Sequence, residues 1–361
     1  MVNIEMHTVL FVSAFHPGAK GAIGAGEAIC GDNLKVFLSR GYAVDVIVLS
    51  PPGQRKNEEL VDRCTSYAEK HTSKGKTLSG LLFNFLKGSF LAPWFYTRVT
   101  PSFIHEIQHK INSNSYDTVW LDFPSVLGVA EHIQHKNIQY FAHDIVSQRI
   151  SRTKINRLFF PLVESVETRL LMKLTNITTM SLKDKELIER LGFRGPVVVA
   201  DLGEQKVGQV DNAVEISSLL PSFSGKSNLV FFGNMKRSEN HWSIVWFIIF
   251  HFIKLKKQRK GLNLWVLGLQ PRRSLRLLQN IIPGLHVVGA VDDPVPAFVQ
   301  ADLNIAPLLY GAGVKIKVLQ ILDAGAKVVA TEVGAEGIQP HKNLYVVDKS
   351  NIGNKILELL D

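Results

Sequence analysis

Residues 302–337 read DLNIAPLLYGAGVKIKVLQILDAGAKVVATEVGAEG, and their pattern indicates one complete turn of a parallel α/β fold. An apolar run at 303–306 is followed by Pro307 and by a loop with glycines, 311–313. A helical pattern then continues to Gly325, and a second apolar run occupies 327–330. Strand, glycine turn, helix, glycine stop and strand is the order typical of parallel α/β units.

The loop before this predicted helix is a candidate anion site. The first N–H groups of a helix have no partners within the helix, and they suit phosphate. With a helix that opens at Gly313, Lys315 and Lys317 fall in its first turn, where cations oppose the helix dipole. An anionic ligand bound near Gly311, Gly313 and the two lysines explains this arrangement.

The overall composition is that of a soluble globular protein. Of the 361 residues, 46% are hydrophobic and 20% are charged, and the length predicts two domains. We expect no signal peptide, since 9–15 reads as a first strand, and no apolar run approaches the roughly 20 residues that span a bilayer. Two cysteines, Cys30 and Cys64, fit a reducing cytoplasm. The net charge of +9 suits an anionic ligand, an anionic membrane surface or nucleic acid, the last being least favoured because no nucleic-acid motif is present.

Both halves of the chain alternate strand and helix patterns, which predicts an α/β fold with two Rossmann-like domains facing each other across a cleft. The expected boundaries are 1–204 for the first domain, 205–226 for the linker and 227–361 for the second domain. Strands are expected at 8–13, 43–49, 116–121, 138–142, 177–180, 197–200, 229–232, 264–267, 286–288, 303–306 and 327–330. Helices are expected at 24–40, 161–174, 182–191 and 352–360.

Two further apolar stretches have two interpretations each. Residues 78–96, LSGLLFNFLKGSFLAPWFY, are either a helix and loop folded against the sheet or a surface that meets a lipid. Residues 242–253 precede KLKKQRK, which favours a buried helix with a solvated cationic end; membrane docking is the alternative.

Several segments together carry a resemblance to a known family. The most specific is 306–338, and others are LVFFGNM (229–235) followed by Asn240, LNLWVLG (262–268) and VVGAVDD (287–293). In order and spacing they resemble GT-B glycosyltransferases of family 4, also called group 1, of the type that assembles bacterial surface polysaccharides. The resemblance covers almost the whole chain.

The resemblance implies a retaining transferase that binds a nucleotide-diphosphate sugar through its second domain and an acceptor through its first. Such enzymes generally use no divalent metal, so no cofactor and no metal ligands are expected. Protein cations and backbone N–H groups would then neutralise the leaving diphosphate. On a helix opening at Gly313, Lys317 and Gln320 share one face, Lys317 toward phosphate and Gln320 toward the ribose or the sugar.

The chain departs from the family pattern at charged positions. Where the family commonly has two glutamates eight positions apart, this chain has Ala312 and Gln320. Asn234, after Gly233, stands where an arginine is expected. We expect Lys236 or Arg237, with Lys315 and Lys317, to replace the missing cations. Glu336 and Gly337 match a family position that offers a backbone donor to the sugar or ribose.

In the first domain, His143 and Asp144 follow a predicted strand. His143 resembles the family's catalytic-region histidine, which contacts the transferred sugar, whereas Asp144 also suits a helix N-cap. His16 and the loop Gly24 to Gly26 are expected on the acceptor side. Glu27 is expected there as well, although its place at a helix start is explained equally well by capping.

The sequence therefore predicts a cytoplasmic glycosyltransferase, located at the inner face of the membrane, with a nucleotide-sugar donor and a glycan or lipid-linked acceptor. One alternative is a pseudo-transferase that scaffolds an assembly complex. The other, less favoured because the loops are poor in carboxylates, is a nucleotide-sugar epimerase or hydrolase.

Overall fold

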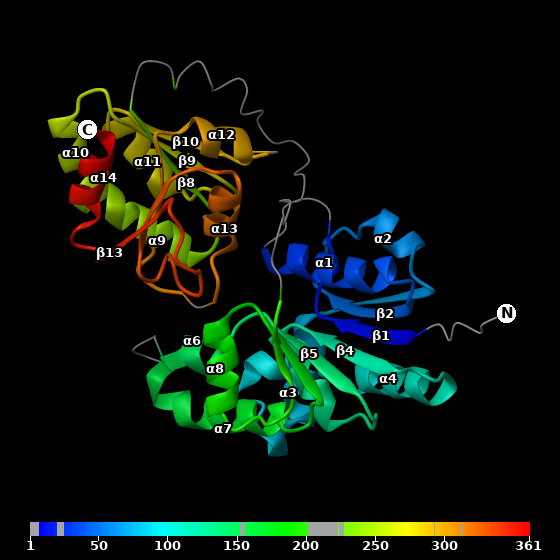
Figure 1. The fold of residues 1–361 in the computed structure, drawn as a ribbon. Coiled ribbons are helices and arrows are strands. Elements are labelled where there is room, and N and C mark those ends of the chain that lie inside the picture. Colours follow the sequence, from blue (N-terminus) through cyan, green and yellow to red (C-terminus); the bar gives the residue numbers. More distant parts are fainter. Residues whose placement is uncertain are drawn as a thin grey trace. The chain divides into compact units, whose positions relative to one another are not determined.

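The structure is a computed structural model that describes residues 7–19, 25–151, 156–200, 223, 227–291, 293–311 and 313–361. The chain divides into two compact units, Met1–Gln205 and Lys206–Asp361 (Figure 1). Each unit contains one parallel β-sheet with packed helices, as predicted. The linker expected at 205–226 lies, apart from Phe223, outside the described residues.

The first unit is built on a seven-stranded sheet in the order β3-β2-β1-β4-β5-β6-β7, with every pairing parallel. Its inner strands are runs of β-branched and aromatic residues, which favour a pleated sheet covered on both faces. The strands are β1 (Thr8–Ser13), β2 (Ala43–Ser50), β3 (Ser66–His71), β4 (Thr118–Asp122), β5 (Ile138–Ala142), β6 (Asn176–Thr179) and β7 (Val197–Val199).

Helices and 3-10 turns connect these strands. Several helices begin at a side-chain cap: Ser73, Thr100 and Ser181 each accept a hydrogen bond from a backbone N–H of the first turn. The longer helices are α1 (Ala25–Ser39), α3 (Lys74–Phe83), α4 (Pro101–Ser113), α7 (Phe160–Leu171) and α8 (Leu182–Arg190). The shorter elements are α2 (Glu58–Asp62), η1 (Phe85–Lys87), η2 (Pro93–Phe95), α5 (Pro124–Leu127), η3 (Gly128–Glu131), α6 (Val146–Ser151) and η4 (Asn156–Phe159).

The second unit is built on a six-stranded parallel sheet in the order β10-β9-β8-β11-β12-β13. Its strands are β8 (Asn228–Phe232), β9 (Asn263–Leu267), β10 (Leu285–Gly289), β11 (Leu303–Ala306), β12 (Val328–Thr331) and β13 (Leu344–Val347). Its helices are α9 (Ser238–Phe247), the π-helical turn η7 (Ile248–Phe252), α10 (Ile253–Gln258), α11 (Arg273–Ile281), α12 (Val295–Gln300), α13 (Ile316–Asp323) and α14 (Ile352–Leu360).

Two apolar cores lie on opposite faces of this second sheet. Alternate residues of β8 belong to different cores: Leu229 and Phe231 pack with residues of α9, η7 and α14, whereas Val230 packs with residues of α12 and α13. Because both faces are covered, the strands read as continuous apolar runs, and that made them recognisable in the sequence.

In both sheets the strand order reverses once, between β1 and β4 in the first unit and between β8 and β11 in the second. Loops that leave the carboxyl ends of the strands diverge at such a point, so ligands of open α/β sheets usually bind there. The predicted site residues follow a strand at one of these reversals, namely β1, β8 or β11, or the next strand along, β5 or β12.

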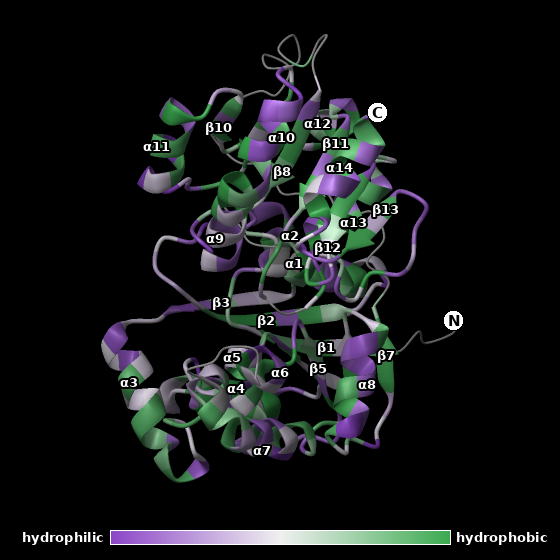
Figure 2. Cartoon of the chain, turned by 90° about the vertical axis from the view of Figure 1, so that its left-hand side faces the viewer, coloured by the Kyte–Doolittle hydropathy of each residue, from purple (hydrophilic) through white to green (hydrophobic). Residues whose placement is uncertain are grey.

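The apolar stretch 78–96 forms α3, η1 and η2, and it is only partly packed. Phe95 and Tyr96 are fully buried, whereas Leu86 is 97% exposed. Figure 2 shows hydrophobic bands along α3.

The second stretch, 242–253, buries Phe247 and other side chains of one face but leaves Trp242 and Phe250 half exposed. The helical interpretation of both stretches is therefore confirmed. The second helix is buried along one face only, and the cationic end that follows it carries the exposed Lys254, Lys257 and Lys260. Within the described residues, no helix is long and apolar enough to cross a membrane.

Candidate functional site

The predicted donor residues of the second unit gather where β8, β11 and β12 end. Gly233 and Asn234 follow β8, Gly311 and Gly313 follow β11, and Glu336 follows β12. These three strands are neighbours in the sheet, so loops that are about 25 to 100 residues apart in sequence lie at one edge.

Lys317 is the central cation of this edge. Its Nζ lies 4.4 Å from the centroid of the Phe231 ring and donates a 2.9 Å hydrogen bond to Oδ1 of Asn240. The loss of hydration around the ammonium group, together with the nearby cations Lys315 and Arg237, lowers the pKa of Lys317 to about 7; Glu239 acts in the opposite direction. No carboxylate of the described residues forms an ion pair with Lys317. A poorly hydrated ammonium group whose hydrogen-bond partner is a neutral amide is suited to an anionic ligand.

Lys315 is oriented differently from the prediction. The helix α13 begins at Ile316 and not at Gly313, so Lys315 precedes it as the N-cap residue. Its Nζ donates to the carbonyl oxygen of Gly313 and lies 3.7 Å from a carboxylate oxygen of Glu336. The expectation that Lys315 lies in the first turn of the helix is therefore wrong. It joins the Gly313 loop to Glu336, and both side chains are about nine-tenths buried.

The loop after β8 carries two exposed cations. Arg237 pairs with Glu239 at 2.6 Å, whereas Lys236 forms no ion pair within 4 Å with any described residue. The loop is held by Asn234, whose Oδ1 accepts a hydrogen bond from the Lys236 N–H and whose carbonyl oxygen accepts one from Asn240. Asn234 thus shapes the loop in which an arginine was expected.

The glycines permit the tight geometry of this edge. Gly311 and Gly313 have φ values of 130° and 73°, and Gly337 has a φ of 74°, a region that residues with side chains rarely adopt. These left-handed residues continue the loop up to Lys315 and explain why the helix begins three residues later than predicted. Gln320 lies on α13 one turn after Lys317, on the predicted face.

In the first unit, His143 lies beside the strand reversal. Its Nε2 is 2.7 Å from Oδ1 of Asp122, and its ring stacks on Phe123 with the centroids 4.2 Å apart. Asp122 ends β4 and is fully buried. A Cβ added to Gly26 would lie 2.9 Å from the Phe123 ring and 3.7 Å from Nδ1 of His143. The predicted catalytic and acceptor-side residues His143 and Gly26 are thus neighbours.

Asp144 pairs with Arg149 and does not cap the following helix. The N–H groups of Val146 and Ser147, at the start of α6, are instead bound by the buried carboxylate of Glu167, at 2.8 Å each. The capping interpretation of Asp144 is therefore wrong, because a carboxylate from α7 occupies that position.

His16 is buried inside the first unit, contrary to the expectation that it lines the acceptor side. Its Nδ1 is 2.7 Å from the Tyr67 hydroxyl and its Nε2 is 2.9 Å from Oε1 of Glu69. Burial lowers the pKa of His16, and Glu69 opposes that shift. Since both ring nitrogens are occupied, the exposed group of this cluster is Glu69, whose side chain is 27% exposed.

The remaining acceptor-side residues lie around the start of α1. Gly24 is outside the described residues. Glu27 lies in the first turn of α1, the place that the capping interpretation requires, and its carbonyl oxygen accepts a hydrogen bond from the Gly18 N–H.

Three residues that contact predicted site residues were not themselves predicted: Asp122 and Glu69 in the first unit, and Asn240 in the second. The sequence singles out Asn240 only through the resemblance, and its contact with Lys317 joins residues 77 positions apart. Asp122 ends an apolar strand, which could have marked it as a site residue. Glu69 lies in a strand with no apolar pattern and gave no such signal.

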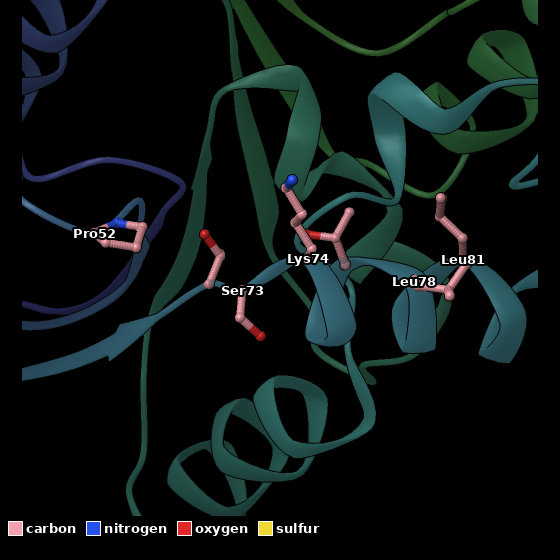
Figure 3. A pocket seen from close by; sticks show the side chains of 7 residues that line it. Pro52, Ser73, Lys74, Leu78 and Leu81 are labelled. Carbon is pink, nitrogen blue, oxygen red and sulfur yellow. The ribbon is translucent and has the colours of Figure 1, made fainter.

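A shallow hollow of about 470 Å³ lies beside α3 in the first unit (Figure 3). The turn after β2 contributes Pro52, and α3 contributes Leu78 and Leu81; Ser73 and Lys74 border the hollow at the start of the helix. Among the described residues, no group of three or more His, Cys, Asp or Glu side chains is arranged to hold a metal ion.

Comparison with known proteins agrees with this architecture. Residues 226–361 match the family model described as "Glycosyl transferases group 1". No protein with curated annotation matches the sequence. Among solved structures, a sucrose-phosphate synthase from Thermosynechococcus elongatus is similar with a TM-score of 0.70 and 13% identity, over 98% of this chain and 90% of the other.

Two further solved structures are similar over the same shares of both chains, 98% and 90%, each with 14% identity. One is HepE from Anabaena in complex with UDP, with a TM-score of 0.64. The other is WaaG, a glycosyltransferase involved in lipopolysaccharide biosynthesis, with a TM-score of 0.62. The chain therefore has the GT-B fold, and its second unit matches the family model of the group 1 glycosyl transferases.

Proposed function

We propose that the chain transfers a sugar, with retention, from a nucleoside-diphosphate donor to a glycan or lipid-linked acceptor during the assembly of a surface polysaccharide. The observation that carries the proposal is Lys317: its ammonium group lies at the carboxyl edge of the second sheet, and among the described residues it contacts a neutral amide and an aromatic ring but pairs with no carboxylate. A diphosphate supplies the negative charge that this environment lacks.

The similar structures support the choice of donor. HepE was solved with UDP, with UDP-glucose, and with UDP and glucose. We infer that this chain also takes a UDP-linked hexose. WaaG acts in lipopolysaccharide biosynthesis, which supports a cell-surface glycan as the product.

In the proposed reaction, the bond between the anomeric carbon and the diphosphate oxygen breaks, and an acceptor hydroxyl bonds to the same face of the sugar. The hydroxyl proton passes to the departing diphosphate, so that charge and atoms balance. Lys317 and the exposed Lys236 stabilise the negative charge that accumulates on the diphosphate, and His143 contacts the sugar. We propose that these protein cations perform the reaction without a divalent metal.

Product analysis with UDP-, GDP- and CMP-linked sugars tests this proposal. We expect turnover with a UDP-sugar in the presence of a glycan acceptor, and a loss of at least about a hundredfold in Lys317→Ala with an unchanged circular dichroism spectrum. Unchanged turnover in Lys317→Ala contradicts the role of this lysine in leaving-group departure.

A pseudo-transferase is the second candidate, favoured by Gln320 and Asn234 at positions where the family carries charged residues. Calorimetry with the same donors separates the two candidates. If the protein binds none of these nucleotides, the transferase is contradicted and the scaffold is favoured. A similar structure also belongs to a putative UDP-N-acetylglucosamine 2-epimerase. An altered sugar formed without any acceptor would favour that third chemistry.

We further propose that the transferase works at the cytoplasmic face of a membrane and docks through the α3 surface of its first unit. This surface consists of the exposed apolar side chains Leu78, Leu82, Phe83, Phe85, Leu86, Phe90 and Leu91. It continues from the hollow of Figure 3, because Leu78 belongs to both.

Charge supports an anionic bilayer as the partner of this surface. Between Glu69 and Glu106 the sequence has no acidic residue, and the exposed Lys74 and Lys76 lie at the start of α3. Two further lysines, Lys70 and Lys87, pair with Glu106 and Glu131. Apolar side chains that enter the headgroup region and lysines that contact anionic lipid are the usual combination of an interfacial segment.

Sedimentation with vesicles tests the docking surface. We expect the chain to bind vesicles of phosphatidylglycerol and phosphatidylcholine and to bind pure phosphatidylcholine less. The double variant Phe85→Ser/Leu86→Ser should release most of the protein, whereas the matched variant Leu277→Ser/Ile281→Ser, on exposed positions of α11, should not. Equal binding of both variants contradicts the assignment of this surface.

A further inference from the structure

His143 is held in a single orientation by groups on three sides. Its ring stacks on Phe123 with an interplanar angle of 8°, and the edge of Phe141 meets it at a centroid distance of 4.9 Å. On the third side, Nε2 faces the carboxylate of Asp122 at 2.7 Å. The side chain is only 10% exposed, so these contacts fix it.

The backbone next to Asp122 is strained to make the stack. Phe123 has a φ of 86°, which is rare and unfavourable for a residue with a side chain. Its ring also meets the edge of Phe15 at 4.7 Å. Strain of this kind persists where the surrounding structure enforces a particular geometry, and here that geometry is the face-to-face contact with His143.

Asp122 determines which nitrogen of His143 carries a proton. The other carboxylate oxygen, Oδ2, accepts hydrogen bonds from Nδ2 of Asn33 at 2.9 Å and from Nε1 of Trp120 at 3.1 Å. Both of these groups can only donate, so Oδ2 accepts. An ionised carboxylate accepts at its other oxygen as well, and Nε2 of His143 then donates to Oδ1 of Asp122. In the neutral imidazole, Nδ1 then carries a lone pair and no proton.

Nδ1 of His143 is buried and has no hydrogen-bond partner among the described residues. It lies on the side of Gly26, where a Cβ would stand 3.7 Å from it. A buried acceptor without a partner is unfavourable, and a donor on a ligand would satisfy it.

We propose that Asp122 is a positioning residue that holds the proton of His143 on Nε2, so that Nδ1 accepts a hydrogen bond from a hydroxyl group of the sugar substrate. This inference deepens the proposed function and rests on it for the identity of the ligand. Asp122 itself is fully buried, and its hydrogen bonds with Asn33, Trp120 and His143 occupy both carboxylate oxygens, so it acts through His143.

The substitution Asp122→Asn tests this proposal because the neighbouring donors fix the orientation of the new amide group. The donors Asn33 and Trp120 both point to the Oδ2 position, so the amide oxygen should face them and the NH₂ group should face His143. An NH₂ group donates to Nε2 and therefore moves the ring proton to Nδ1. The shape of the site is kept while the acceptor at Nδ1 is lost.

The experiment measures the ¹⁵N shifts of the His143 ring in the full-length protein with labelled histidine, the signals being assigned with His143→Gln. We expect the proton on Nε2 in the wild type and on Nδ1 in Asp122→Asn. Turnover should fall about ten- to hundredfold in kcat, while KM for the UDP-sugar changes little. As a control, Asp45→Asn exchanges another largely buried carboxylate, which is bound by Ser66 and Tyr116, and should leave the His143 ring unchanged.

A wild-type ring protonated on Nδ1 alone overturns the proposal even if Asp122→Asn does not fold. A variant that moves the proton but keeps full turnover also overturns it, as does one that loses turnover with the proton still on Nε2. The ¹⁵N measurement of the ring needs no substrate, so it tests the positioning by Asp122 even in a protein without transferase activity. A lack of transferase activity would contradict the proposed function alone.

Discussion

The ammonium group of Lys317 donates a 2.9 Å hydrogen bond to the side-chain oxygen of Asn240, a residue 77 positions earlier in the chain. Asn240 is well placed for this contact because its own NH₂ group donates to the carbonyl oxygen of Asn234 at 3.0 Å, which fixes the orientation of the amide. Gly233 allows the approach, since a Cβ at that position would lie 3.0 Å from Nδ2 of Asn240. A neutral partner keeps the positive charge of Lys317 available for an anion.

Asn240→Asp should therefore weaken nucleotide binding. A carboxylate at this distance would neutralise Lys317 and repel the diphosphate, and we expect the Kd for UDP to rise about tenfold. Isothermal titration calorimetry measures the change. Asn351→Asp adds the same charge at the exposed start of α14 and should alter the Kd less than about twofold; equal effects of the two variants would mean that only net charge matters.

The affinity for UDP should fall as the pH rises above 7. The pKa of Lys317 is lowered to about 7 by burial and by neighbouring cations, whereas diphosphate binding favours the charged ammonium group. Binding at pH 8 therefore takes up a proton, and the Kd should rise by up to about tenfold per pH unit between 7 and 9. Calorimetry in two buffers with different ionisation enthalpies counts the protons. A Kd that is constant over this range, with no proton uptake, would contradict a diphosphate bound to Lys317.

Lys317→Met should make the protein more stable near neutral pH. The lowered pKa means that the folded state binds fewer protons than the unfolded state between pH 7 and about 10, so wild-type stability increases with pH in that window. Below pH 7 the charge must be kept in its poorly hydrated position, and its removal should raise the free energy of unfolding by about 1 kcal/mol. The gain should shrink toward pH 9. Thermal melts at pH 6 and pH 9 check this, with Lys342→Met at an exposed position as the control.

Gly268→Ala should disturb the loop after β8, at the carboxyl edge of the second sheet. Gly268 has a φ of 121°, and a Cβ there would lie 2.1 Å from the carbonyl oxygen of Gly233. Strain and the clash together should cost about 2–4 kcal/mol and displace the loop after β8. Gly261→Ala is the matched control, because nothing lies within 4 Å of its added Cβ. Similar melting temperatures for the two variants would show that the loop tolerates the displacement.

The sequence predicted the inner strands of both sheets because both faces of those strands are buried, which produces continuous apolar runs. It also predicted the edge strands β7 and β10, but it missed the other two edge strands, β3 and β13. An edge strand has fewer buried neighbours, and SYAEKH in β3 accordingly shows no apolar pattern. The start of α13 was placed three residues too early because the left-handed conformations of Gly311 and Gly313 cannot be inferred from a helical pattern alone.

The sequence predicted several of the site residues, but it did not predict which residues they contact. Lys317 and His143 were recognised from their places after strands and from the resemblance. Their contacts with Asn240 and Asp122 depend on how separate strands align in the sheet, and no local pattern encodes that alignment. For the same reason, the pairing of Lys315 with Glu336 was not foreseen.

Titration of UDP into the wild type and into Lys317→Met tests the central claim most directly, because it measures the capture of a diphosphate without requiring the acceptor. We predict that the wild type binds UDP at pH 7 and that Lys317→Met, although folded, binds at least about tenfold more weakly. Equal affinities of the two proteins, or no binding of UDP, GDP or CMP by the wild type, would contradict the account.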